Sequence, residues 1–429
     1  MTTTINNEHK KLNFSNEREQ SQACLNSAEH EKNQGRKVLN VPNLRFPEFE
    51  GEWEKLGLSE LLDFKNGLNP KPDKFGKGIK FISVMDILNN AVITYDCIKA
   101  SVDVTEKELS DFSVEKGDML FQRSSETFED VGRANVYMDD KTAVFGGFVI
   151  RGKKKGEYDP QYFNYLLRSP LARKRIIPMG AGAQHFNIGQ EGLSKVKLHF
   201  ANIEEQKKIG KMLSLLDERI ATQNKIIEDL KKLKSAIIEK EYSNKTKSIS
   251  RLGDFIEQIS KRNKDRAIHS VLSVSNSQGF IQQSEQFENR IVASDDTSNY
   301  KIVKRNYFAF NPARINVGSI ARLITFERGI VSPMYICFRT KDSLFPEYLG
   351  YYFESKQFFI EIQKRLEGSV RQCLSFEGLC NISLSIPMVE VQQQIGKRLS
   401  ALVQEIKLET DFLELLQKQK KFLLHQMFI

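Results

Sequence analysis

A long amphipathic segment occurs twice in this chain, and this repeat constrains the fold more than any other feature of the sequence. QKKIGKMLSLLDERIATQNKIIEDLKKLK begins at Gln206, and QQQIGKRLSALVQEIKLETDFLELLQKQK begins at Gln392, 186 residues further on (392 − 206). Twelve of the 29 aligned positions are identical without a gap. Good helix formers are few, so part of this match is expected of any two helices. The shared IGK and the single offset nevertheless indicate an internal duplication.

The duplication extends upstream at the same offset. DPQYFNYLLRS at Asp159 aligns with FPEYLGYYFES at Phe345, and GAQHFNIGQEGL at Gly182 aligns with GSVRQCLSFEGL at Gly368. The chain therefore reads as two similar modules, each a mixed globular region followed by a long helix. We expect a flexible, polar extension at 1–40, a first globular region at 41–200, its helix at 201–243, a second globular region at 244–388 and its helix at 389–429.

Local patterns predict the elements inside each module. Short β-branched and aromatic runs between turn residues predict strands, among them KFISVMDI, AVITYDCI, DMLFQRS and AVFGGFVIRG in the first module. LSKVKLHF is expected to be its last strand. A helix is expected after Asp159 as N-cap, with Pro160 at its first position. Asn202 and Glu205 predict a capping box at the start of the first long helix.

The two long segments are expected to pair with each other. Their apolar residues follow the 4-3-4 spacing of a coiled-coil seam, at Ile209, Leu213, Leu216, Ile220, Ile227 and Leu230 and at Ile395, Leu399, Leu402, Ile406, Leu413 and Leu416. Polar residues interrupt both stripes at equivalent positions, Gln223 and Lys234 in one and Glu409 and Lys420 in the other. Matched interruptions would fix the register. The alternative is two separate surface helices, each packed on its own domain.

Charge and cysteine content indicate the kind of partner and the compartment. The net charge is +9, and residues 244–388 carry +6 of it (20 − 14), which suits a polyanion. The long helices are nearly neutral, which suits protein partners. Five cysteines without a CxxC pair indicate reduced thiols in the cytoplasm. We expect no membrane association, because no apolar run approaches ~18 residues and no export signal is visible.

Signatures of catalysis are missing from the sequence. GFVIRGKK at Gly147 resembles a phosphate loop, but Lys154 stands where Ser or Thr should hold magnesium. GAGAQHFNIG lacks the third glycine of a dinucleotide turn, because His185 occupies that place. NPAR at Asn311 is not the NPPF/Y motif of an amino-methyltransferase, and six scattered histidines offer no metal spacing. We expect no catalytic residue, no metal site and no cofactor bound by this chain.

These residues resemble those of a known family. VPNLRFPEFEGEWE, VEKGDMLFQRS, the loop before LSKVKL, EEQKKIGKMLSLLDERI and the tail GSVRQCLSFEGLCNISLSIPMVEVQQQIGKRLSAL are similar to the specificity subunit of type I restriction–modification systems. The resemblance extends from residue 41 to the end, and residues 1–40 fall outside it. It implies an α+β fold: two tandem mixed α/β target-recognition domains, with the two long helices pairing as an antiparallel coiled coil.

The resemblance also implies the function. Each domain would read one half of a gapped site in double-stranded DNA, and the helices would hold two methyltransferase subunits, with restriction subunits as further partners. This chain would have no catalysis of its own, and the partner subunits would use S-adenosylmethionine, ATP and magnesium. Two other classes are a coiled-coil adaptor, which explains the helices but not the modules, and a standalone DNA-modifying enzyme, which the missing motifs oppose.

Candidate DNA-contacting residues lie in loops between the expected strands, where Arg, Asn, Gln and Ser can reach base edges. In the first module they are Arg123, Ser124, Ser125, Arg133, Gln184, His185 and Asn187, and in the second Asn311, Arg314, Asn316, Arg371 and Gln372. Lys71, Lys74 and Lys77 are expected to contact phosphates. A surface salt bridge is the alternative for each arginine, and a loop histidine without a role is the alternative for His185. Gly180 and Gly182 would allow a close backbone approach.

Overall fold

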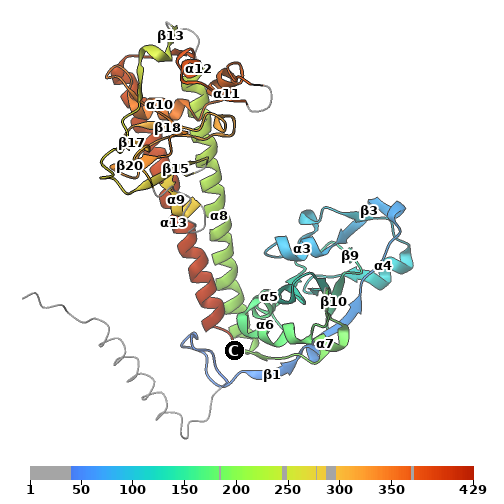
Figure 1. Cartoon of the computed structure of the whole chain (residues 1–429). Helices are drawn as coiled ribbons and strands as arrows, with labels where there is room; N and C mark the ends of the chain where they lie inside the picture. Colours follow the sequence, from blue (N-terminus) through green and yellow to red (C-terminus); the bar gives the residue numbers. More distant parts are fainter. Residues whose placement is uncertain (1–39, 183–184, 244–248, 277, 287–295, 369–371) are drawn as a thin grey trace, which may run out of the picture. The chain divides into compact units, whose positions relative to one another are not determined.

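The computed structural model describes residues 40–182, 185–243, 249–276, 278–286, 296–368 and 372–429 (Figure 1). The expected extension at 1–40 therefore lies outside the described residues, except for Asn40. Two compact units are present. The first extends to Glu218 and also contains Gln417–Ile429, and the second comprises Arg219–Leu416. Each unit contains one mixed domain and part of both long helices.

The domain of the first unit is built on two four-stranded sheets and one two-stranded sheet. Their strands are β1 (Glu54–Gly57), β2 (Leu62–Asn66), β3 (Phe75–Ile82), β4 (Ser101–Val102), β5 (Ser113–Val114), β6 (Met119–Gln122), β8 (Ala134–Val136), β9 (Ala143–Phe145), β10 (Val149–Lys154) and β12 (Lys197–Phe200). The strand orders are β2-β10-β6-β8, β4-β3-β9-β5 and β1-β12. A further pair joins β7 (Ser124–Ser125) to β11 (Phe186–Asn187).

The second domain repeats this topology. Its strands are β13 (Ile249–Arg251), β14 (Ile256–Ile259), β15 (Val271–Ser275), β16 (Gly279–Gln282), β17 (Lys301–Lys304), β18 (Phe308–Phe310), β19 (Ile320–Arg322), β20 (Arg328–Val331), β21 (Ile336–Thr340) and β22 (Ser383–Ser385). The orders β14-β21-β18-β19, β16-β15-β20-β17 and β13-β22 match those of the first domain one by one. The parallel pair also recurs, as β3 with β9 and as β15 with β20. The duplication inferred from the sequence is thus a duplication of the fold.

Helices follow the sheets in the same order in both domains. The first has α5 (Pro160–Arg168), α6 (Pro170–Ile176) and α7 (Gln190–Ser194), and the second has α10 (Pro346–Tyr352), α11 (Lys356–Gln363) and α12 (Phe376–Cys380). The expected cap of α5 is confirmed, because the Asp159 side chain accepts a hydrogen bond from Tyr162 N at 2.8 Å. Shorter elements are α2 (Leu58–Leu61), α3 (Val84–Asn89), α4 (Glu106–Phe112), α9 (Gln283–Gln286) and the 3-10 turns η1 (Pro72–Lys74), η2 (Tyr95–Cys97), η3 (Phe128–Asp130), η4 (Ile177–Met179), η5 (Leu252–Asp254) and η6 (Ile315–Val317).

Two expected strands are only partly strands, and a third is not a strand. KFISVMDI leaves β3 and enters α3, because the Ser83 hydroxyl and backbone N–H both donate to the Asp86 carboxylate, at 2.7 and 2.8 Å, and cap a helix. AVITYDCI contains η2 and contributes only Ile93 to an isolated bridge. LSKVKLHF begins in α7, and its strand β12 starts at Lys197. Local hydrogen bonds from polar side chains override the apolar pattern in the first case.

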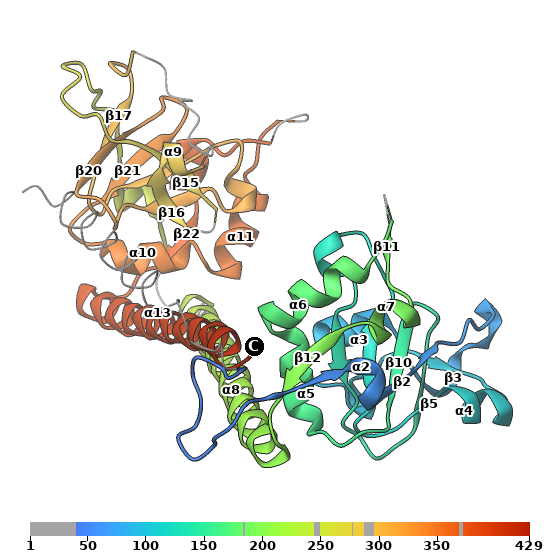
Figure 2. The same ribbon diagram turned by 90° about the horizontal axis from the view of Figure 1, so that it is seen from below.

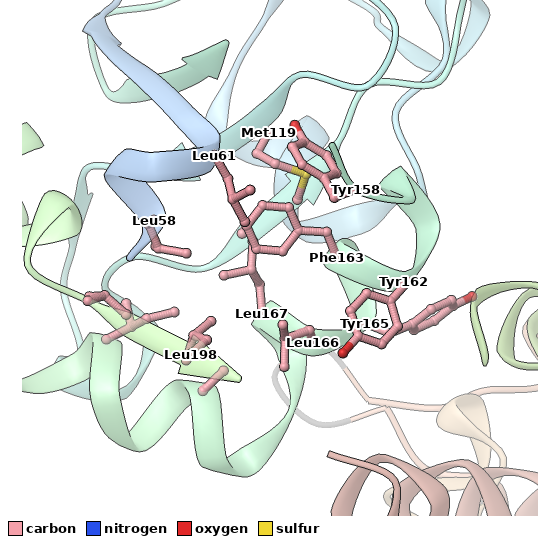
Figure 3. Packing of buried hydrophobic residues seen from close by; sticks show 14 of the residues in the cluster. Leu58, Leu61, Met119, Tyr158, Tyr162, Phe163, Tyr165, Leu166, Leu167 and Leu198 are labelled. Atoms are coloured by element: carbon pink, nitrogen blue, oxygen red, sulfur yellow. The ribbon is translucent and has the colours of Figure 1, made fainter. Parts of the chain in front are cut away.

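The core of the first unit surrounds α5 (Figure 3). Tyr162 and Phe163 of this helix pack against Phe200 at ring-centroid distances of 6.4 and 5.1 Å. Phe428, from the far end of the described chain, packs against Trp53 at 6.4 Å and is buried. The core of this unit therefore combines residues that are hundreds of positions apart in the sequence.

The long helices are α8 (Ile203–Tyr242) and α13 (Val389–Gln426), which lie side by side in antiparallel directions (Figure 1, Figure 2). Within the second unit, the Gln223 amide donates to the Glu409 backbone oxygen at 3.1 Å and also to its carboxylate. The two residues are equivalent positions of the repeat. Equivalent residues can face each other only about a local two-fold axis, so this polar pair marks the antiparallel register.

The seam residues are covered along both helices. Six of them are buried, namely Ile209, Leu213, Ile227, Ile395, Leu399 and Leu416. The other six are half-buried, namely Leu216, Ile220, Leu230, Leu402, Ile406 and Leu413. At the other interruptions, Lys234 pairs with Glu354 at 2.6 Å and Lys420 pairs with Asp217 at 2.5 Å.

A buried glutamine attaches each long helix to its domain. The Gln206 side chain accepts from Asp159 N at 3.0 Å and donates to Ala201 O at 2.8 Å. At the equivalent place, the Gln392 side chain accepts from Phe345 N at 2.7 Å and donates to Pro387 O at 2.8 Å. These bonds satisfy backbone groups at the turn that precedes α5 or α10, so the helix–domain junction is duplicated along with the domains.

The expected capping box of α8 is half wrong. Asn202 does cap the helix, because its side-chain oxygen accepts from Glu205 N at 2.9 Å. The Glu205 carboxylate, however, does not return to the cap. It forms a two-point ion pair with Arg45, whose Nε and Nη2 each lie 2.8 Å from a carboxylate oxygen. A buried carboxylate gains more from a guanidinium than from one backbone N–H, and this explains the difference.

Candidate nucleic-acid interface

Two loops that we expected separately from the sequence come together in the first domain. β7 pairs with β11, which places Ser124 opposite Asn187 and Ser125 opposite Phe186. The Ser124 hydroxyl donates to the Asn187 side-chain oxygen, and Ile188 N donates to Arg123 O at 2.9 Å. Half-buried polar groups of the first loop and exposed ones of the second therefore form one cluster. His185 is exposed beside it, Ser125 is buried within the pair, and Gln184 lies outside the described residues.

The tight turn behind this cluster depends on glycine. Gly182 has φ +144°, and a Cβ at this position would lie 1.9 Å from His185 O. Only glycine fits so close to another backbone group. At Gly180 a Cβ would lie 2.7 Å from a methyl group of Val131. These two glycines therefore allow neighbouring parts of the same domain to pack closely against each other.

The second domain joins the corresponding loops with the same hydrogen bond. Leu374 N donates to Pro312 O at 3.1 Å, as Ile188 N does to Arg123 O. Asn311 is buried, and its side-chain oxygen accepts from Ala313 N at 3.1 Å, so it shapes the turn. Arg314 and Gln372 are exposed, Asn316 is half-buried and Arg371 lies outside the described residues.

The candidate phosphate-contacting lysines surround η1. Lys71 is exposed just before it, and both Lys74 and Lys77 reach the Asp103 carboxylate, at 3.5 and 3.8 Å. Because these side chains remain 43% and 71% exposed, the ion pairs are solvated and contribute about 0–1 kcal/mol each. Asp103 therefore balances part of the local charge without burying the lysines.

Two arginines that were not predicted from the sequence lie beside Arg133. Arg168 of α5 and Arg173 of α6 line a cavity of about 420 Å³ together with Arg133. Burial lowers the pKa of Arg168 and lowers the pKa of Arg173 to about 10, and the nearby Arg133 charge adds to both effects. Arg173 thus stays protonated at neutral pH, as arginine side chains in proteins do. The signal for them in the sequence is the cluster of basic residues in LLRSPLARKR, which follows the expected start of a helix after Asp159.

Other kinds of site are not visible in the part of the chain that the structure describes. No group of three or more His, Cys, Asp or Glu side chains among the described residues could hold a metal ion. Within the same residues, no helix combines the length and the apolar character that a bilayer span needs.

A family model decides the relationship of this chain to known proteins. The type I restriction modification DNA specificity domain matches it twice, at residues 50–232 and 244–418. The chain belongs to this family. It is a specificity subunit with two copies of the DNA specificity domain, each carrying its long helix.

Relatives and solved structures agree with this assignment. The specificity subunit is 24% identical over 413 residues to the MjaX specificity subunit of Methanocaldococcus jannaschii, covering 90% of this chain and 95% of that one. It is 22% identical to the MjaVIII specificity subunit of the same organism, covering 88% and 92%. The S subunit from M. genitalium has the same fold, with a TM-score of 0.56 at 16% identity, covering 91% of this chain and 99% of the other. A chain from a structural study of the assembly and conformational transition of the type I R-M system matches with a TM-score of 0.52 at 13% identity, covering 87% of this chain and 96% of the other.

Proposed function

We propose that this specificity subunit binds a gapped, bipartite site in duplex DNA, with one half-site for each recognition domain. The observation that supports the proposal is the repeated pair of polar loops, joined by the same backbone hydrogen bond in both copies. The side chains differ between the copies: Arg123, Ser124 and Asn187 in one, and Arg314 and Gln372 in the other. Different side chains on a common scaffold would read different half-sites.

We further propose that the helix pair holds two methyltransferase subunits, and restriction subunits through them. In the second unit, α8 exposes Ile226 and Leu233, and α13 exposes Leu408 and Leu415. Each pair is spaced by seven residues, so it lies on one face of its helix and outside the seam. Exposed apolar faces of this kind suit a helical partner. The near-neutral charge of the helices supports a protein rather than DNA as the occupant.

Catalysis and cofactors belong, in this proposal, to the partners. The methyltransferase and restriction subunits would use S-adenosylmethionine, ATP and magnesium in the cytoplasm, and this chain would bind none of them. Purified chain supplied with all three and with DNA should neither methylate nor cleave. Turnover by a verified pure sample would contradict this, whereas a standalone enzyme would require it.

One experiment tests the DNA-reading role directly. The chain is expressed with its methyltransferase subunits, and modified bases are mapped across the host genome. We expect one bipartite sequence with a fixed spacer to be methylated, and the modification to vanish when this chain is omitted. A coiled-coil adaptor without DNA recognition would leave the methylated sequence unchanged on omission.

A further inference from the structure

The cavity beside the first recognition cluster has an unusual lining, which we call the arginine pocket (Arg133, Arg168 and Arg173). Its remaining wall is largely apolar and includes Ile87, Leu167 and Ile177. η3 carries Phe128, whose ring packs on Phe186 of β11 at 5.2 Å. The pocket therefore adjoins the loop pair that contains Ser124 and Asn187.

Positive charge exceeds negative charge in this pocket. Arg168 donates to Ala134 O and Asn90 O at 3.3 and 3.2 Å, and Arg173 donates to three backbone oxygens at 2.6 to 2.9 Å. Carbonyl oxygens fix these guanidinium groups but do not cancel their charge. Arg133 pairs with Asp130 at 2.6 Å, and Glu129 also lines the pocket. Three cations and one carboxylate thus line the pocket. Outside the lining, Asp130 pairs with Arg133, and Asp217, which also acts on Arg168, is already paired with Lys420.

The second domain shows that the fold does not need these arginines. At the repeat offset, Arg133, Arg168 and Arg173 correspond to Ser319, Glu354 and Phe359. The second domain nevertheless forms η6, α10 and α11 in the places of η3, α5 and α6. The first domain therefore has three arginines at positions where the second domain has none. A purely structural role does not explain them.

We propose that the arginine pocket receives one sugar–phosphate unit of the DNA backbone. Guanidinium groups bind phosphate oxygens at two points, and half-buried ones such as Arg168 and Arg173 do so with less competition from water than exposed ones. The half-exposed Arg133 would make the first contact, and the apolar wall would face the deoxyribose. The inference rests on the proposed function and deepens it, because a backbone contact here would fix the register of the neighbouring base-reading loops.

The test measures DNA affinity against salt concentration. The full complex with its methyltransferase subunits is titrated with duplex DNA carrying the mapped site. Arg133→Ser introduces the residue that the second domain has at this place. We expect binding to weaken about tenfold at low salt, and the slope of log affinity against log salt to fall by about 0.9, the value of one phosphate contact.

Lys116→Ser is the matched control. The Lys116 side chain is 52% exposed, as is that of Arg133, and it also pairs with a carboxylate, Asp140, at 3.0 Å. It belongs to the same domain but does not line the pocket. This control should leave the slope unchanged. Glu129→Gln removes a competing carboxylate and should tighten binding, which loss of a structural contact would not do.

A neutral methylphosphonate, placed at each backbone position in turn, locates the phosphate. At one position it should weaken binding by the wild-type complex but not by Arg133→Ser. The inference is overturned if Arg133→Ser lowers the slope no more than Lys116→Ser does, or if no single position depends on Arg133. If the wild-type complex prefers no DNA sequence, the proposed function itself fails, so the two failures are distinguishable.

Discussion

Removing Arg45 should destabilise the first unit more than removing its partner Glu205. The Glu205 side chain is 0% exposed, and both its oxygens are 2.8 Å from Arg45 nitrogens. Arg45→Ala leaves a fully buried carboxylate without its counter-charge, which costs about 3–5 kcal/mol. In Glu205→Ala, Arg45 keeps its bonds to Gly51 O and Glu50 O, at 2.6 and 3.0 Å. We therefore expect a loss of only about 1–3 kcal/mol.

Trp53 makes the measurement specific to this unit. It is the single tryptophan of the chain, it is 4% exposed, and it belongs to the core of the first unit. Its emission during a denaturant titration therefore reports the unfolding of that unit. Lys207→Ala, which removes the exposed i,i+3 pair with Glu204, is the control and should leave the free energy of unfolding nearly unchanged.

The reasoning would be refuted if Arg45→Ala cost no more than the Lys207→Ala control, or if Glu205→Ala were the more damaging change. A double variant, Arg45→Met with Glu205→Leu, adds a second check. It removes both charges and keeps apolar volume, so it should be more stable than Arg45→Ala.

Three further predictions concern modularity, spacing and reactivity. Replacing residues 41–200 by the corresponding domain of a relative should change one half-site of the methylated sequence and leave the other intact; a change in both would contradict modular reading. Inserting four residues between Thr222 and Lys225, at the polar position Gln223, lengthens α8 by ~6 Å and should lengthen the spacer while keeping both half-sites. An active insertion variant with an unchanged spacer would show that the helices do not set this distance. Burial raises the pKa of Cys337 to about 12, so in native protein at neutral pH a thiol reagent followed by mass spectrometry should label Cys97 and Cys373 well before Cys337.

The sequence was most informative where a pattern repeats. The seam residues, the Asp159 cap and the two long helices follow from periodicity and capping chemistry, which act within a few residues. The repeat also predicted that two domains share one topology. Glu205 shows the limit of such reasoning, because its partner Arg45 is 160 residues away in the sequence and no local rule links them.

The candidate interface was predictable in part for the same reason. Arg123 and Asn187 follow from residue type and loop position, but their meeting through β7 and β11 depends on tertiary folding. Arg168 and Arg173 lie on helices, where an arginine normally indicates a solvated face. Their convergence with Arg133 becomes visible only when α5 and α6 are packed against η3.

The packing of Phe428 against Trp53 has a consequence for the order of events on the ribosome. Synthesis from one residue to the other spans 375 positions (428 − 53), which at ~5–20 residues per second takes roughly 20 to 75 s. During that interval the domain translated first lacks part of its core. All residues of the second unit, which ends at Leu416, emerge before Phe428 does. The domain encoded first is therefore the last to be completed. The apolar seam of α8 stays uncovered until α13 has been synthesised.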